Sequence, residues 1–318
     1  MAENKLENNV AGAVSCSKKK PWISNRKKTH IQEFLFVLPA LILLAVFTYY
    51  PIAKLFQISL TDWNLLRPEW NLVGLKNWKW LFNGSGAKYL WNSLEVTFIY
   101  SLGEIFATLV GGMLFALLFK RMTRSFSAMR AIIFVPKYVA MSSCAVVFLW
   151  ILNTDHGILN YLLGLVGVGP IDWLNQESTA LLSVLMTTCW RVVGYGMMIY
   201  LSAMMGISPQ YYEAASLDGA SSTKQFFKIT LPLLSPTTLF LLVTTFLSSM
   251  KVFQSVDILT SGGPARSTEV FVYLIYRYAM VDFRMDRAAT SAVFFFVILL
   301  VVTICTMRFS QNKVNYDS

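Results

Sequence analysis

Six long apolar stretches constrain this chain more than any other feature of its sequence. They occupy residues 34–53, 96–119, 131–152, 181–205, 231–250 and 288–307. A bilayer core about 30 Å thick is crossed by roughly 20 apolar residues in a helix, so each stretch is long enough to span a membrane. None alternates like a barrel strand, and backbone groups in lipid must be satisfied within their own segment. The sequence therefore predicts an all-α integral membrane protein with six transmembrane helices.

The composition excludes the ordinary soluble classes and gives no sign of an enzyme. Of the 318 residues, 55% are hydrophobic and only 14% are charged, whereas soluble domains have about a quarter of their residues charged. The two histidines lie far apart, and the four cysteines are never close in sequence, so no metal-site or haem spacing is present. No cluster of acids with a base and no nucleophile motif indicates a membrane-embedded enzyme.

Lysine and arginine are unevenly distributed between the segments that join these stretches. They are concentrated in segments 1–33, 120–130 and 206–230, whereas segment 153–178 has none. Because positive residues accumulate in cytoplasmic loops, both termini are predicted to be cytoplasmic. The net charge of +10 is then explained by topology, and binding to nucleic acid is not expected.

The same pattern predicts how the chain is divided. A shorter apolar stretch at 270–280, too short to span, is expected to form an interfacial or re-entrant helix. The predicted parts are a basic cytoplasmic tail (1–33), a first transmembrane helix (34–53), an outer loop (54–95), a five-helix core (96–309) that includes the inner loop 206–230, and a cytoplasmic tail (310–318).

The inner loop has signals for a compact helix–turn–helix. Ser208 is suited to the N-cap of a short helix with Pro209 at its first position. The helix is expected to include residues 213–217, and Gly219 is suited to a left-handed turn at its end. Ser221 or Ser222 can begin a second short helix that is expected to end near Phe227. From these signals alone, a docking element and an ordinary connecting loop both remain open.

The order of residues in this loop resembles a family signature. Glu-Ala-Ala at 213–215, Asp-Gly-Ala at 218–220 and Ile-Thr-Leu-Pro at 229–232 are similar to the loop of permease subunits of binding-protein-dependent ABC importers. Segments 59–63, 73–77, 157–160 and 257–264 resemble outer loops of the carbohydrate-uptake branch, which includes maltose-type and glycerol-3-phosphate-type permeases. The likeness covers roughly residues 31–309.

The resemblance implies a type I ABC importer permease fold in which the inner loop docks on a cytoplasmic ATPase. Carried over by position, Glu213, Ala214, Ala215 and Gly219 would dock, and Asp218 would support the turn. The chain has no phosphate-binding loop of the G-x-x-x-x-G-K-[ST] type, so ATP hydrolysis would come from a separate chain.

The resemblance also implies the substrate and the partners. The substrate would be a sugar or oligosaccharide, or alternatively a non-sugar solute such as a glycerol phosphate. The partners would be a second homologous permease, two copies of an ATP-binding subunit, an extracytoplasmic solute-binding protein and membrane lipid. No cofactor or metal is expected on this chain, since ATP and Mg belong to the ATPase, and the expected location is a prokaryotic plasma (inner) membrane. A stand-alone secondary carrier is the alternative of another class, although no convincing internal repeat supports it.

A charge at membrane depth indicates the substrate path. Arg191 lies near the middle of the stretch 181–205, and such residues usually face the interior of a helix bundle. An ion pair between Arg191 and Glu104 is the structural alternative. The residues predicted to line the path are Arg191, Tyr195, Tyr200, Lys251, Gln254 and Asp257.

Overall fold

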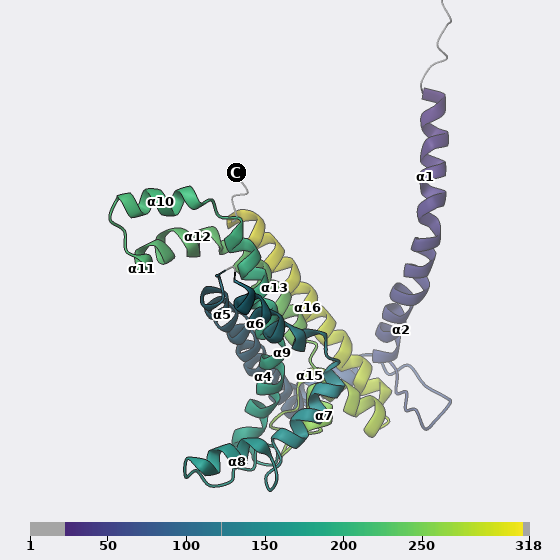
Figure 1. Ribbon diagram of the computed structural model, residues 1–318. Coiled ribbons are helices and arrows are strands. Elements are labelled where there is room, and N and C mark those ends of the chain that lie inside the picture. The colour runs from purple at the N-terminus through teal and green to yellow at the C-terminus, as the bar shows by residue number, and fades with distance from the viewer. Residues whose placement is uncertain (1–22, 122, 314–318) are drawn as a thin grey trace, which may run out of the picture. The chain divides into compact units, whose positions relative to one another are not determined.

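The computed structural model describes residues 23–121 and 123–313, and these residues are almost entirely helical (Figure 1). The chain forms two compact units, residues 1–54 and 55–318. The first unit contains α1 (Ile23–Leu44), a π-helical turn, η2 (Ala45–Tyr49), and the start of α2 (Tyr50–Ser59), which ends in the second unit. The predicted tail 1–33 is thus helical from Ile23, because lysine and arginine favour helices; residues 1–22 lie outside the described residues. The first helix also continues to Ser59, beyond the predicted end at residue 53.

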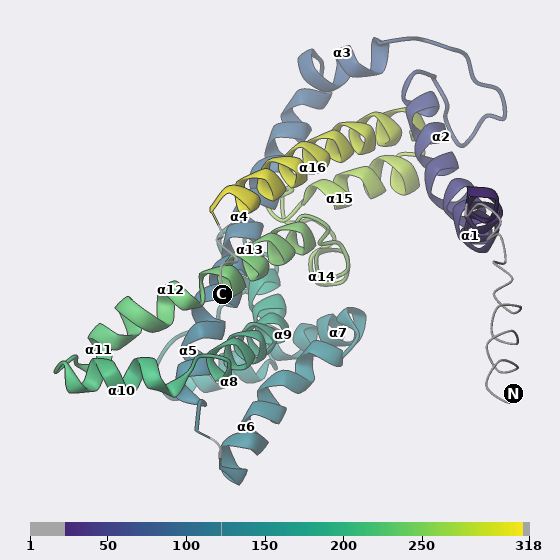
Figure 2. The same ribbon diagram turned by 90° about the horizontal axis from the view of Figure 1, so that it is seen from above.

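The second unit contains the remaining helices, which are joined by loops of varied length, by π-helical turns and by a 3-10 turn, η4 (Figures 1 and 2). In chain order they are α3 (Lys76–Asn83), α4 (Gly86–Phe106), η3 (Ala107–Gly111), α5 (Gly112–Leu118), α6 (Arg124–Phe134), η4 (Val135–Tyr138), α7 (Met141–Ile151), α8 (Ile158–Leu165), α9 (Glu177–Met205), α10 (Pro209–Leu217), α11 (Ser222–Gln225), η5 (Phe226–Thr230), α12 (Leu231–Leu233), α13 (Ser235–Ser249), α14 (Gln254–Leu259), α15 (Phe271–Tyr276), η6 (Arg277–Val281) and α16 (Met285–Lys313).

Four helical segments of the described chain are long and apolar enough to cross a membrane: Glu33–Ser59, Gly86–Leu118, Glu177–Met205 and Met285–Thr306. The other two predicted spans are sharply bent. Arg124–Tyr138 meets Met141–Ile151 at 105°, and Ser222–Leu233 meets Ser235–Ser249 at 61°. Each bend lies beside a proline, which lacks a backbone N–H and interrupts the helical hydrogen bonds. If each bent pair counts as one span, the number reaches six, as predicted.

Helix α9 is the centre of the second unit and packs against α4, α5, α6, α7, α13 and α14. Two glycines allow a close approach between α9 and the segment formed by η3 and α5. A Cβ atom on Gly196 would lie 2.4 Å from the carbonyl oxygen of Thr108, and one on Gly112 would lie 2.8 Å from the carbonyl carbon of Gly196. Small residues that bring backbones together are a common means of packing transmembrane helices.

The segment between α13 and α16 folds back on the bundle. The apolar stretch predicted at 270–280 forms α15 and η6, and Phe271 and Leu274 are fully buried. Just before α15, the carboxylate of Glu269 is buried between two arginines. Glu269 Oε2 lies 3.1 Å from Arg266 Nη1, and Glu269 Oε1 lies 3.0 Å from Arg277 Nε.

Glu269 is expected to make stability depend on pH. Burial raises the pKa of Glu269, and Arg277 and Arg266 offset only part of that rise. The native state therefore holds the proton more tightly than the unfolded state, whose glutamate pKa is about 4.3. The contribution of Glu269 to the free energy of unfolding should therefore fall as the pH rises from about 4.3 through the pKa that Glu269 has in the folded protein.

The pH effect can be measured as the difference in unfolding temperature between wild type and Glu269→Gln in detergent micelles, from pH 4 to pH 8. We expect this difference, wild type minus variant, to decrease with rising pH. The exposed Glu69 provides the matched control, Glu69→Gln. A difference that grows with pH would contradict the direction of the shift.

Candidate functional site

A cavity of about 390 Å³ opens within the second unit, between α4, η4, α7, α9 and the connection from α13 to α14. Polar and charged side chains from all these elements except α7, which contributes Met141, reach it. The lining residues are Tyr100, Glu104, Lys137, Met141, Thr188, Arg191, Val192, Ser248, Lys251, Val252, Phe253, Gln254 and Ser255. Polar side chains at membrane depth are costly and usually mark a solute path, so this cavity is the candidate site.

Arg191 extends from α9 toward the break between η4 and α7. Its Nη1 donates to Met141 Sδ at 3.0 Å, and its Nη2 donates to the main-chain carbonyl of Lys137 at 3.3 Å. The Nε atom of Arg191 is buried and has no hydrogen-bond partner. Both acceptors are uncharged, so the guanidinium is held in place without a counter-ion from these contacts.

The alternative ion pair between Arg191 and Glu104 is not formed. Both residues line the cavity, but within the described chain no ion pair joins them. The Glu104 carboxylate accepts instead from Ser248 Oγ, at 3.3 Å. Glu104 thus links α4 to α13, and Arg191 links α9 to the bend.

Lys137 is a cavity residue that the sequence prediction missed. Gly194 allows α6 to approach α9 so closely that a Cβ atom on Gly194 would lie 2.1 Å from the carbonyl oxygen of Ile133. This contact places η4 against α9, with Lys137 Nζ 4.6 Å from the centre of the Tyr195 ring. A lysine beside a proline, Pro136, within an apolar stretch was the available signal.

The structure brings together three of the six predicted path residues. Arg191, Lys251 and Gln254 line the cavity. Tyr195 contacts Lys137 from outside the lining, and Tyr200 is buried in the packing core, where its hydroxyl donates to Thr238 Oγ1 at 3.1 Å. Asp257 lies half-buried on α14, also outside the lining. The role of all six in transport stays a prediction.

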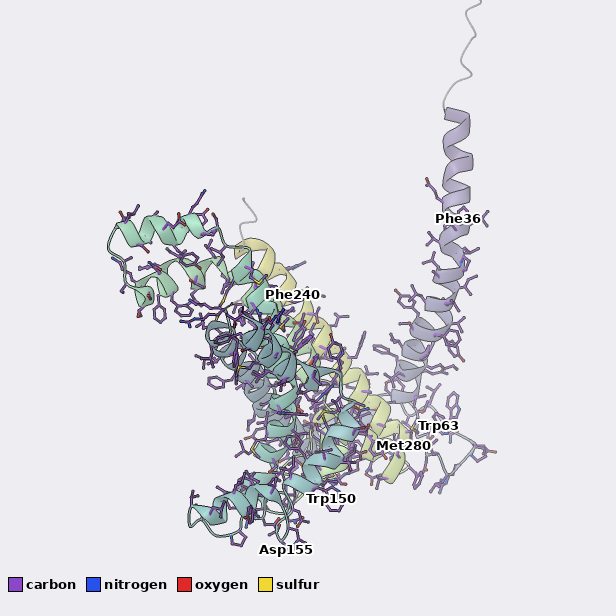
Figure 3. All side chains as sticks on the ribbon, in the orientation of Figure 1. Phe36, Trp63, Trp150, Asp155, Phe240 and Met280 are labelled. Carbon is purple, nitrogen blue, oxygen red and sulfur yellow. The ribbon has the colours of Figure 1, made fainter. Side chains whose placement is uncertain are left out.

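The inner loop forms a helical hairpin, α10 to α12, that projects from the bundle (Figures 1 and 2). Figure 3 shows Phe240 of α13 at this end, whereas Trp150 and Asp155 lie at the opposite end, near α8. Helix α10 begins at Pro209 with Ser208 at its N-cap, as predicted, and ends at Leu217. Gly219 has φ +74°, the left-handed turn expected from its sequence position. The N–H groups of Gly219 and Ala220 donate to the carbonyls of Ser216 and Ala215, which caps α10.

The second limb of the hairpin is longer than predicted. Ser221 caps α11 by accepting from the N–H of Lys224, but the helix does not end near Phe227. It continues through the π-helical turn η5 into α12 and ends at Leu233, because no helix-breaking residue lies before Pro232.

Side-chain hydrogen bonds tie the two limbs together. The hydroxyls of Tyr212 and Thr230 lie 3.0 Å apart, and Gln225 Nε2 donates to Ser216 Oγ at 3.0 Å and to the Ala220 carbonyl at 3.1 Å. The predicted docking residues Glu213, Ala214, Asp218 and Gly219 are exposed, and Ala215 is half-buried. Leu217 beside them is 90% exposed.

Comparison with known proteins places this architecture in a family. Residues 107–314 match the model of the family described as binding-protein-dependent transport system inner membrane component. The chain belongs to this family. The resemblance noted in the inner loop is thereby confirmed, and this permease is a transport subunit, not an enzyme.

Curated relatives cover nearly the whole permease. It is 33% identical to the probable ABC transporter permease protein YurN of Bacillus subtilis, over 89% of this chain and 97% of the relative. It is 31% identical to the sn-glycerol-3-phosphate transport system permease protein UgpA of Agrobacterium fabrum, over 90% and 97%. The trehalose/maltose transport system permease protein MalF of Thermococcus litoralis is 29% identical, over 88% and 94%.

A solved structure confirms the fold. A chain in the crystal structure of a bacterial ABC transporter involved in the import of the acidic polysaccharide alginate superposes with a TM-score of 0.78. The match covers 92% of this permease and 99% of that chain, at 23% sequence identity. The predicted all-α fold of the type I importer permeases is therefore confirmed.

Proposed function

We propose that this permease subunit passes a sugar, an oligosaccharide or a related solute such as a glycerol phosphate, delivered by an extracytoplasmic solute-binding protein. The observation that carries the proposal is the cavity of about 390 Å³ lined by polar side chains from several helices. Its volume lies within the range of about 300–1,000 Å³ that is usual for small-molecule sites. The printed names of the relatives UgpA and MalF support this substrate class.

The proposal assigns the hairpin to energy coupling. The exposed residues Glu213, Ala214, Asp218 and Gly219 would bind a separate ATP-binding subunit, which supplies ATP and Mg. The capped turn and the bonds between the limbs support this role, because a rigid element transmits motion better than a mobile loop. Two ATP-binding subunits and a second, homologous permease would complete the importer in a prokaryotic plasma membrane, with both termini in the cytoplasm.

The test is transport by the complete importer in proteoliposomes. We expect uptake of at least one radiolabelled solute from a panel of neutral oligosaccharides, acidic oligosaccharides and sn-glycerol 3-phosphate. Uptake should require both ATP and the solute-binding protein, so vesicles that lack either one are the controls. Uptake that needs neither would show a secondary carrier, and no uptake of any member would overturn the proposed substrate class.

A further inference from the structure

The charges that line the cavity are unbalanced. Lys137, Arg191 and Lys251 contribute three basic side chains, and Glu104 is the single acid of the lining, so two positive charges are in formal excess. A charge at membrane depth is costly unless an opposite charge or a set of hydrogen bonds compensates it. The excess therefore raises the question of what neutralises it.

The cavity's own groups do not neutralise these basic side chains. No ion pair to Lys137, Arg191 or Lys251 is present within the part of the chain that the structure describes. Glu104 accepts from Ser248 Oγ, and Lys137 Nζ lies over the Tyr195 ring. A cation–π contact of this kind stabilises a cation but does not cancel its charge.

Two buried donors in the lining are unused. The Nε atom of Arg191 and the hydroxyl of Ser255 are both buried without a hydrogen-bond partner. Ser255 is fully buried, on α14, and Arg191 reaches the cavity from α9. Buried polar groups are nearly always paired in native proteins, so spare donors at a cavity indicate a ligand with acceptor oxygens.

We infer that the solute carries an anionic group, a carboxylate or a phosphate, which binds at Arg191 within this cavity. The inference rests on the proposed function and narrows its substrate class. The planar guanidinium matches the paired oxygens of a carboxylate or a phosphate. Lys251, which is exposed, adds positive charge at the edge of the cavity, and Ser255 offers a neutral donor.

The test compares matched solutes in the complete importer reconstituted in proteoliposomes. The pairs are trigalacturonate against its fully methyl-esterified, uncharged form, and sn-glycerol 3-phosphate against glycerol. We expect uptake of a charged member and little uptake of its neutral counterpart. Arg191→Gln should lower uptake of the charged solute by about tenfold or more, because it removes the charge and the paired donors that would bind the anionic group. Arg191→Lys, which keeps the charge, should retain part of the activity.

Two further variants keep the test decisive. Lys251→Gln changes an exposed residue, so it should fold normally and still reduce the preference for the charged solute. Lys79→Gln removes an exposed lysine from α3, outside the cavity, and should leave uptake unchanged.

Uptake of a neutral saccharide, unaffected by Arg191→Gln and Lys251→Gln, would overturn the inference and leave the proposed function standing. If no member of the panel is taken up, both the inference and the proposed substrate class are overturned.

Discussion

Replacing Gly219 by valine is expected to abolish most ATP-driven uptake while the permease still assembles. Gly219 has φ +74°, and a Cβ atom built there would meet nothing within 4 Å, so the effect is backbone strain and not a clash. A side chain in the left-handed region costs about 1–2 kcal/mol, and β-branched residues resist it most. If the hairpin must keep this turn in order to dock, that cost lowers the docked population by about tenfold.

Two control variants test whether the loss of uptake comes from backbone strain at the Gly219 turn and not from a valine at any position of positive φ. Gly219→Asn should keep most uptake, since asparagine tolerates the left-handed region. Gly167→Val is the matched control, because Gly167 has φ +81° and equally open surroundings but follows α8, far from the hairpin along the chain. Uptake is measured in proteoliposomes, with the amount of assembled complex measured in parallel. Wild-type uptake by Gly219→Val, or an equal loss in Gly167→Val, would remove the coupling role of Gly219.

Replacing Gly196 by alanine is expected to destabilise the fold itself. The added Cβ atom would lie 2.4 Å from the carbonyl oxygen of Thr108, which belongs to the backbone and cannot move aside like a side chain. Overpacking of this kind costs about 1–3 kcal/mol, and more where backbone atoms collide. Helix α9 must then move away from η3 and from α5, which follows it, and this also disturbs the buried contacts between α9 and α5.

The measurement for Gly196 is the unfolding temperature of the purified permease in detergent. Gly164→Ala in α8 is the control, because a Cβ atom there meets nothing within 4 Å. We expect a clear fall in unfolding temperature for Gly196→Ala and a change near zero for Gly164→Ala. Equal unfolding temperatures for the two variants would show that α9 and α5 can relax apart without cost.

The positions of the spans could be predicted from the sequence, but the bends could not. Length and apolar character depend on local residues, so all six stretches were found in helices or bent helix pairs. A bend of 105° beside Pro136 depends on what packs against it, here α9 at Gly194. The helix through Phe227 was predicted to end too early, because η5 continues as a π-helical turn that no residue pattern announces.

The candidate site was predicted only in part, for a related reason. The apolar pattern of α9 does not reveal which face points inward, so Arg191 and Tyr200 could not be separated by position alone. Tyr200 packs in the core and does not line the cavity. Lys137 lies next to Arg191 instead, because the bend brings η4 toward α9. The Gly219 turn was predictable, since it depends on neighbouring residues only.

Arg191 donates a hydrogen bond to the main-chain carbonyl of Lys137. The positive charge of the Lys137 side chain can therefore be removed without removing the support that residue 137 gives to Arg191. Lysine 137 supports the guanidinium with its peptide oxygen, which every amino acid possesses, while its amine lies over the Tyr195 ring. Exchanging that side chain for an uncharged one of similar length therefore changes the electrostatic potential of the cavity and leaves the anchor of Arg191 in place. One substitution at residue 137 can thus change how strongly the cavity attracts a charged solute while the hydrogen bond that holds Arg191 is kept.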